Sequence, residues 1–465
     1  MSGASSLLEA AEALRNGTVS SVELTQASLT AIARLQPRLN FFLAMMDEAA
    51  LARARHLDDE RQRGHLRGLL HGIPVAVKDV FCTKGVKTTC ASPLFADHVP
   101  DYDAAVVEKL YEAGAVIVGK THMHELAYGV TSNNPHYGPV RNPWNVSHVP
   151  GGSSGGSGAA VSAGSVYMAM GSDTGGSIRL PAAFCGCVGL KPTTGRVSRY
   201  GVMPLDFTLD HMGPLTRTVR DTATVLQVLA GHDPRDDSSS KAPVSSYTPG
   251  RISIKDVRIG VPENFYTERL HPDIAQAMDN LRKLAAGLGA RLEPVRVPDM
   301  AELNAVARVV LLSEASAVMS PYLGDRTKFG PDVLALFDQG RLLAATDYVN
   351  AQRLRRVYQR EFAKVWERCD VLLTPCSPNP VPRIGQTEVD LGGVMEDTRL
   401  ASTRFVRAIN LLGLPALALP CGMTGDELPV AAQIIGRPFD EATVLWVGAA
   451  LEDTMEFSRA MPPMV

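Results

Sequence analysis

Several features that mark specialised classes of protein are scarce in this chain. Seven cysteines among 465 residues, an odd number without paired spacing, do not indicate a disulfide-stapled scaffold. A formal net charge of −3 excludes the basic excess that nucleic acids or anionic membranes select. No uninterrupted apolar run reaches the roughly 18 residues of a membrane-spanning helix, and residues 1–17 lack the pattern of a signal peptide. We therefore expect a soluble, cytoplasmic protein that binds neither membrane nor, directly, nucleic acid.

Metal-binding patterns are equally sparse. Cys185 and Cys187 form a C-x-C pair, but they lie in the apolar run AAFCGCVGL and no second pair completes a zinc site. We interpret them as small core residues. His122 and His124 form H-x-H, which lacks a third ligand and the H-E-x-x-H spacing. The sequence thus predicts no metal and no cofactor.

Start and stop signals of two helices are present at the beginning of the chain. Ser6 with Glu9, and Ser20 with Glu23, each fit the S-x-x-E capping box, and Asn16-Gly17 fits a helix end between them. We expect helices on either side of that stop.

Strands and helices alternate from there on. GIPVAVKDV, residues 72–80, is typical of a buried strand with Lys78 near its end. A helical pattern over 103–113 stops at Gly114, and AVIVGK follows as a strand. The alternation predicts an α/β fold, with a large, mixed, mostly parallel twisted sheet covered by helices on both faces. The same alternation of strand and helix recurs later in the chain, with a strand at 257–262, a helix from about residue 273 and a strand after residue 289.

One polar stretch, residues 232–250, is the clear linker and divides a glycine-rich front half from a more helical back half. The back half ends in the strand-like segments PALALPCG (415–422) and PVAAQIIG (429–436). Because these strands are expected to pair with the same sheet, we predict a single domain over residues 1–465.

Two glycine-serine clusters lie close together. In DTGGSIR, residues 173–179, consecutive glycines let backbone N–H groups turn toward one point and form a nest for negative charge. A serine at the end of such a nest can attack a carbonyl whose oxygen then falls into it. A tight turn with a capping serine is the alternative.

The other cluster, GGSSGGSG at 151–158, fits known loops poorly. It lacks the Gly-Lys-Ser/Thr ending of a phosphate loop and the G-x-G-x-x-G of a dinucleotide fold. Residues 151–155 match G-x-S-x-G, the nucleophile elbow of α/β-hydrolases. That elbow follows a buried strand, and NPWNVSHVP (142–150) is a poor strand.

Lys78 adds a base to these clusters. Desolvation at an apolar strand end disfavours the ammonium form, and a neutral lysine can accept a proton through a bridging serine hydroxyl. The alternative is a lysine that packs its stem and pairs with the adjacent Asp79.

Taken together, Lys78, GGSSGGS and GSDTGGSIRLPAAFCG resemble the amidase signature family of serine amidases. The spacing agrees, with 75 residues from Lys78 to Ser153 and 24 from Ser153 to Ser177. The resemblance covers nearly the whole chain and is densest over about residues 70–220. In the back half it includes GLPALALPCG and AAQIIGRPFDE.

This resemblance implies the amidase signature fold and a set of site residues. Ser177 corresponds to the acylated nucleophile, Ser153 to a bridging serine after a cis peptide bond from Gly152, and Lys78 to the ultimate base. The oxyanion hole is implied at the backbone N–H groups of Thr174, Gly175, Gly176 and Ser177. Supporting positions are Ser154, Asp173 and Arg179. Substrate-contact positions are Ala127, Tyr128 and Gly129, with His122 and His124 expected beside them.

The implied function is an amide hydrolase that cleaves carboxamide or anilide C–N bonds through a Ser-Ser-Lys triad and an acyl-enzyme. Its partner is a small-molecule amide, and a homodimer is compatible with the resemblance. A non-catalytic binding protein is the weaker hypothesis, because every member of the catalytic set is present.

A rival function is the glutaminase subunit of a tRNA-dependent amidotransferase, which the front half also resembles through CTKGVKTTCAS, YDAAVVEKLYEAGAVIVGKT and RNPWNVSHVPGGSSGG. Two segments depart from it. FGPDVLALF (329–337) places Ala335 and Leu336 where glutaminase members carry paired arginines, and their M-D-E-F is MHEL here, residues 123–126.

Without an arginine at these positions, the carboxylate of a free amino acid would be left unpaired, at a cost of roughly 1–3 kcal/mol or more. The sequence therefore favours a stand-alone amidase acting on a less polar amide. We expect Arg353, Arg355 and Arg356, on a predicted helix, to form a solvated face.

Overall fold

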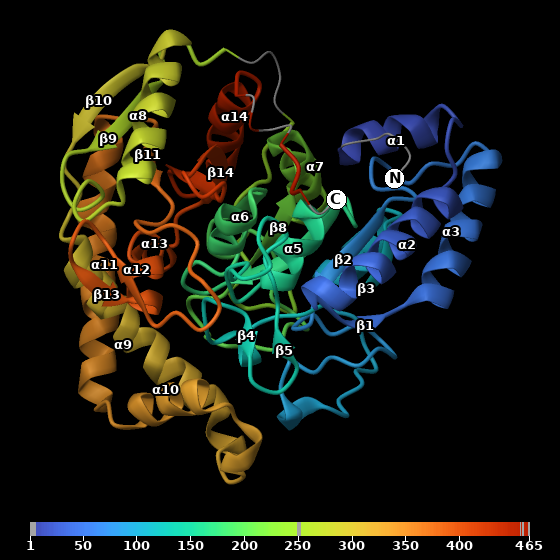
Figure 1. The fold of residues 1–465 in the computed structure, drawn as a ribbon, viewed down its shortest axis with the longest axis horizontal. Coiled ribbons are helices and arrows are strands. Elements are labelled where there is room, and N and C mark those ends of the chain that lie inside the picture. Colours follow the sequence, from blue (N-terminus) through green and yellow to red (C-terminus); the bar gives the residue numbers. More distant parts are fainter. Residues whose placement is uncertain (1–5, 249–252, 456, 458–459, 464–465) are drawn as a thin grey trace.

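A computed structural model describes residues 6–248, 253–455, 457 and 460–463. Its centre is an eleven-stranded sheet in the order β1-β3-β2-β6-β8-β7-β14-β15-β11-β9-β10 (Figure 1). The strands of this sheet are β1 Phe42–Met45, β2 Pro74–Lys78, β3 Val116–Thr121, β6 Met168–Asp173, β7 Val188–Lys191, β8 His211–Thr216, β9 Arg258–Pro262, β10 Arg291–Val295, β11 Val371–Pro375, β14 Ala416–Met423 and β15 Pro429–Gly436. Two small hairpins pair β4 Asn133–Asn134 with β5 Gly138–Pro139, and β12 Glu388–Asp390 with β13 Met395–Asp397.

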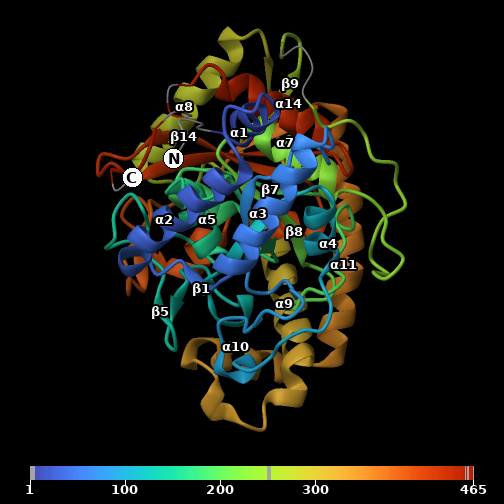
Figure 2. The same ribbon diagram turned by 90° about the vertical axis from the view of Figure 1, so that its right-hand side faces the viewer.

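Helices surround the sheet, with α1–α3 at its β1 end and α8–α11 toward its β10 end (Figures 1 and 2). Both predicted capping boxes form, so α1 and α2 start where expected. The α-helices are α1 Leu7–Arg15, α2 Ser21–Leu39, α3 Asp47–Gln62, α4 Ala105–Glu112, α5 Gly155–Ser162, α6 Arg179–Cys185, α7 Val219–Leu229, α8 Pro272–Gly287, α9 Met300–Met319, α10 Pro331–Arg341, α11 Ala345–Ala363, α12 Thr398–Thr403, α13 Arg407–Leu412 and α14 Glu441–Glu452.

The sheet is mixed, and its parallel pairs lie toward the two flanks. β3, β2 and β6 run parallel on one side, and β11, β9 and β10 on the other. The strands between them, β6-β8-β7-β14-β15-β11, pair antiparallel. The prediction of a large mixed sheet covered by helices is confirmed, with the correction that parallel pairs are not the majority.

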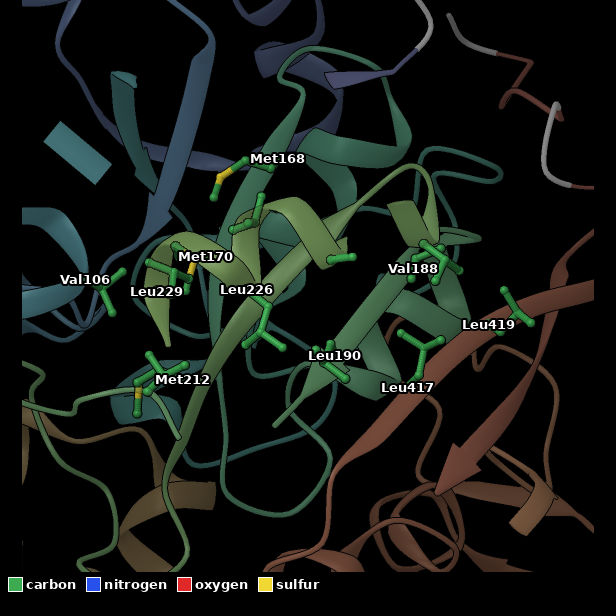
Figure 3. Close-up of a cluster of buried hydrophobic side chains, with 14 of the residues drawn as sticks. Val106, Met168, Met170, Val188, Leu190, Met212, Leu226, Leu229, Leu417 and Leu419 are labelled. Atoms are coloured by element: carbon green, nitrogen blue, oxygen red, sulfur yellow. The ribbon is translucent and has the colours of Figure 1, made fainter. Parts of the chain in front are cut away.

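Side-chain size alternates along the central strands. Met168 and Met170 of β6 belong to one core, under α1, α7 and α14, whereas Ala169 faces the other, under α2, α5 and α6. Figure 3 shows the large side chains of the first core, among them Leu417 and Leu419 of β14. Because side chains of a strand alternate between its faces, the alanine face leaves room for helices to approach closely.

Helix α5 uses that room. A Cβ atom on Gly156 would lie 2.3 Å from the His122 carbonyl oxygen and 2.5 Å from that of Phe41. Only glycine permits this approach, which explains part of the glycine richness of residues 151–158. The approach sets the loop before α5 against the sheet edge.

The back half continues the same sheet through β9, β10, β11, β14 and β15, as the sequence predicted. Residues 232–248, the described part of the polar linker, contain no helix or strand. Met300–Tyr322, which includes α9, is long and apolar enough to cross a membrane by length and composition, although the sequence has no uninterrupted run of that length. Half of its apolar window is buried, and α9 packs against α10, α11 and α13, which is also typical of a core helix.

Candidate active site

Two loops meet the carboxyl ends of two neighbouring parallel strands inside the sheet. Lys78 is the last residue of β2, and Ser172 and Asp173 end the neighbouring β6. Since β2 and β6 are parallel, their carboxyl ends lie side by side. The loops before α5 and α6 bring Ser153 and Ser177 to these strand ends.

Lys78 is fully buried and contacts two serines. Its Nζ donates to Ser153 Oγ at 2.7 Å and to Ser172 Oγ at 2.8 Å. Burial lowers the pKa of Lys78 to about 7, although the charges of Asp210 and Asp173 oppose this shift. A large fraction of the amine is therefore neutral near neutral pH and able to accept a proton.

The alternative in which Lys78 pairs with Asp79 is wrong. Asp79 Oδ1 lies 3.5 Å from Lys120 Nζ, and its Oδ2 accepts hydrogen bonds from the backbone and hydroxyl of Thr89. Asp79 thus pairs with Lys120 and Thr89, whereas Lys78 contacts the two serines.

The two predicted reactive serines differ in access. Ser153 follows a cis peptide bond from Gly152 and is fully buried, whereas Ser177 is 7 % exposed and lines a pocket. Ser154 joins the two loops to β6: its N–H donates to the Ser177 carbonyl at 3.2 Å, and its hydroxyl donates to the Ser172 carbonyl at 3.2 Å. Among the described residues, no hydrogen bond joins the hydroxyls of Ser153 and Ser177.

Asp173 and Arg179 form a buried clamp under the glycine loop. Arg179 Nε and Nη2 each donate to the Asp173 carboxylate at 3.0 Å. Burial alone raises the pKa of Asp173, but the Arg179 guanidinium and the hydrogen bonds hold it well below its usual range. Arg179 also donates to Gln433 Oε1 at 2.6 Å and to Asn410 Oδ1 at 2.5 Å. The clamp therefore joins the front-half loop to β15 and α13.

Sequence reasoning missed Asn410, Gln433 and Ser172. Gln433 carried a usable signal, since it is a lone polar residue within the apolar strand PVAAQIIG. Ser172 directly precedes the predicted Asp173, and its place beside Lys78 follows from the β2–β6 pairing, which the sequence does not reveal.

The predicted oxyanion cradle needs one correction. The N–H of Gly176 donates to Asp173 Oδ1 at 2.7 Å, so it is occupied within the chain. Thr174, Gly175 and Ser177 are the remaining backbone donors. The Thr174 hydroxyl is fixed by a 2.5 Å hydrogen bond to Asp210 Oδ1, which orients this end of the loop.

The pocket beside Ser177 contains the predicted substrate-contact positions. Ala127, Tyr128 and Gly129 line it together with Thr174 and Gly175. Tyr128 packs against the ring of Phe337, with ring centroids 5.3 Å apart. The predicted segment thus forms one wall of the pocket next to the serine loop.

The two histidines do not line the pocket, contrary to the prediction. His122 hydrogen-bonds through its ring to backbone atoms of Met123 and Gly138, and burial lowers its pKa to about 4. His124 Nε2 lies 3.1 Å from Asp332 Oδ2, behind Gly129. The His124 ring therefore lies against the Gly129 part of the wall from outside the pocket.

Sequence reasoning missed three arginines that line the pocket: Arg308 on α9, Arg399 on α12 and Arg407 on α13. No motif marks them, because they come from separate helices. The arginines considered on α11 lie elsewhere. Arg355 is half-buried and donates to the carbonyls of Leu411 and Thr208, so the predicted solvated face is wrong at this position.

This geometry is that of an α/β enzyme whose centre pairs serine with lysine. The chain belongs to the amidase family, since the family model described as Amidase matches residues 23–445. Its fold and sequence place it among amidase signature enzymes, which act on C–N bonds.

Known proteins resemble nearly the whole chain. A glutamyl-tRNA(Gln) amidotransferase subunit of Carboxydothermus hydrogenoformans is 38 % identical, with 98 % of each chain covered. A chain from an inhibitor-bound vestigial protein complex, linked to the evolutionary origins of an s-triazine catabolic enzyme, is 35 % identical with a TM-score of 0.93, covering 97 % of this chain and 98 % of the other. A bacterial aryl acylamidase of the amidase signature family is 26 % identical with a TM-score of 0.88 and 96 % coverage of both chains.

Proposed function

We propose that the protein hydrolyses amides, with Ser177 as nucleophile, Ser153 as proton bridge and Lys78 as base. The observation that carries this proposal is the 2.7 Å contact between Lys78 Nζ and Ser153 Oγ, made by a lysine whose pKa is lowered to about 7. A charged lysine in that place could donate but could not accept the proton that the reaction releases.

In the proposed cycle, Ser177 Oγ attacks the amide carbon while its proton passes to Ser153 and that of Ser153 passes to neutral Lys78. The oxyanion rests on backbone donors of the glycine loop. The C–N bond then breaks as the proton returns through Ser153 to the leaving nitrogen. Water attacks the acyl-enzyme by the same relay, and the carboxylic acid leaves.

Variants of the three residues test this proposal. We expect Ser177→Ala to abolish amine release and Lys78→Ala to lower kcat by about 10²-fold or more, since general base catalysis contributes that much. Ser245→Ala and Lys87→Ala, both at exposed positions, are the matched controls and should retain activity. Wild-type turnover by purified Ser177→Ala would refute the assignment.

A second candidate is the glutaminase subunit of a tRNA-dependent amidotransferase. The 38 % identity to a glutamyl-tRNA(Gln) amidotransferase subunit over 98 % of both chains favours it. Leu336 lines the pocket where glutaminase members carry an arginine, but Arg308, Arg399 and Arg407 line the same pocket, so this departure does not count against glutamine as a substrate. Under this candidate, a protein partner and tRNA-bound substrate complete the activity.

Glutamine hydrolysis separates the two candidates. A stand-alone amidase releases ammonia from its amide without any other protein. The glutaminase subunit releases it from glutamine, and only or mainly after the other amidotransferase subunits are added.

Size-exclusion chromatography of the chain alone also tests the predicted homodimer.

The expectation of a less polar substrate loses its basis in this structure. It rested on the absence of an arginine near the substrate, yet Arg308, Arg399 and Arg407 line the pocket. The pocket therefore carries positive charge that a substrate has to meet.

A further inference from the structure

The pocket beside Ser177 carries positive charge that the protein does not neutralise. Among the described residues, no carboxylate forms an ion pair with Arg308, Arg399 or Arg407. Arg308 Nη2 donates to Gln339 Oε1 at 3.1 Å, and Arg407 donates to the hydroxyl of Thr403, both uncharged partners. Three cations thus face one cavity in a chain whose net charge is −3.

This arrangement is costly unless an anion completes it. Burial, followed by repulsion from Arg399 and Arg308, lowers the pKa of Arg407 to about 10, so it still carries its charge near neutral pH. The carboxylate of Asp397 favours the charged form of Arg407, but the two groups are too far apart to form an ion pair. By contrast, the buried Arg179 is paired with Asp173 at 3.0 Å. All three arginines are partly exposed, so the cost lies in the mutual repulsion of like charges around one cavity, and an anionic ligand would relieve it.

Tyr128 supplies an independent observation on the same pocket. Its side chain is only 6 % exposed, and its hydroxyl has no hydrogen-bond partner among the residues that the structure describes. Because a buried hydroxyl without a partner costs free energy, it indicates an acceptor that belongs to a ligand. Tyr128 thus lines the same pocket as the three arginines, and their charges act on its buried, unpartnered hydroxyl.

The cluster lies close to the proposed reaction centre. The Cγ atom of Arg407 is 3.8 Å from where a Cβ on Gly175 would lie, and Gly175 belongs to the proposed oxyanion loop. Much of the remaining wall is aliphatic and includes Leu205, Leu311 and Leu336. A short aliphatic spacer between the reacting carbonyl and an anionic group fits this layout.

We infer that the substrate is a small amide that carries at least one carboxylate, held by Arg407 with Arg399 and Arg308 and by the Tyr128 hydroxyl. This inference rests on the proposed amide hydrolysis at Ser177. It replaces the less polar amide that the sequence favoured.

Kinetics with a matched pair of amides test the inference. Succinamate carries a carboxylate, and butyramide is its neutral counterpart of similar size. We expect the wild type to prefer succinamate. Arg407→Met should lower kcat/KM for succinamate by roughly 10- to 100-fold, the range for a charge-assisted hydrogen bond, while that for butyramide stays unchanged. Arg356→Met, at an exposed position of α11, is the control and should change neither value.

Binding to Ser177→Ala separates this inference from the proposed mechanism, because it needs no turnover. By calorimetry, we expect succinate and succinamate to bind more tightly than butyramide, and Arg407→Met or Arg399→Met in this background to remove the difference. Equal or tighter binding of butyramide, or no effect of either arginine variant, would overturn the inference. Amide turnover that survives in Ser177→Ala would instead overturn the mechanism.

Discussion

At the scale of single residues, the surroundings of Lys78 explain the proposed chemistry. A lysine in water is charged near neutral pH, whereas here burial lowers the pKa to about 7. Ser153 and Ser172 accept its hydrogen bonds without adding charge. The amine is therefore held in place and can still lose its proton.

This environment predicts the pH dependence of activity. The charged form of Lys78 is inactive as a base, so kcat/KM should be level above pH 7 and fall about tenfold per pH unit well below that value. A profile of kcat/KM between pH 5 and 9 measures this fall at acidic pH. A flat profile across that interval would contradict a lysine base.

The sequence could predict Lys78, Ser153 and Ser177 because they lie in long, specific segments. It could not predict the three pocket arginines, since each comes from a different helix and none lies in a motif. Gly176 shows a further limit: its φ of +120° and its hydrogen bond to Asp173 are features of the folded loop.

At the scale of elements, the position of α5 depends on glycine. Its approach to the sheet leaves no room for a Cβ on Gly156, and the loop that carries Ser153 precedes this helix directly. The sequence predicted a minority of the helices and strands, among them α1, α2, β2 and β3, because their signals are local. It did not predict the antiparallel centre of the sheet, since the pairing of β14 with β7 joins segments more than 200 residues apart.

Substituting Gly156 tests this account of α5. We expect Gly156→Ala to destabilise the protein by about 1–3 kcal/mol through overpacking and to lower activity with it. The matched control is Gly287→Ala at the end of α8, where a Cβ meets nothing within 4 Å. Urea denaturation measures both, and equal stability of the two variants would contradict the close approach.

At the scale of the whole molecule, the buried Arg179 side chain links the two halves of the chain by hydrogen bonds. Arg179 binds Asp173 in the front half and Gln433 and Asn410 in the back half. The nucleophile loop lies in the front half, and the pocket arginines lie in the back half. Their relative position therefore depends on this clamp.

Breaking the clamp should affect the whole fold. Arg179→Met leaves the Asp173 carboxylate buried without its partner, which should cost about 3–5 kcal/mol. Arg291→Met removes an exposed ion pair with Asp256 and should cost at most about 1 kcal/mol. Urea denaturation of both variants compares the two costs, and similar values would contradict the role of the clamp.

The central claim is that Ser177 is the nucleophile, and mass spectrometry tests it most directly. The wild type is treated with a serine-directed sulfonyl fluoride, digested and mapped. We predict one modified residue, Ser177, with loss of amide turnover and much slower labelling in Lys78→Ala. Modification at another residue, or amide turnover that continues after Ser177 is fully blocked, would contradict the account.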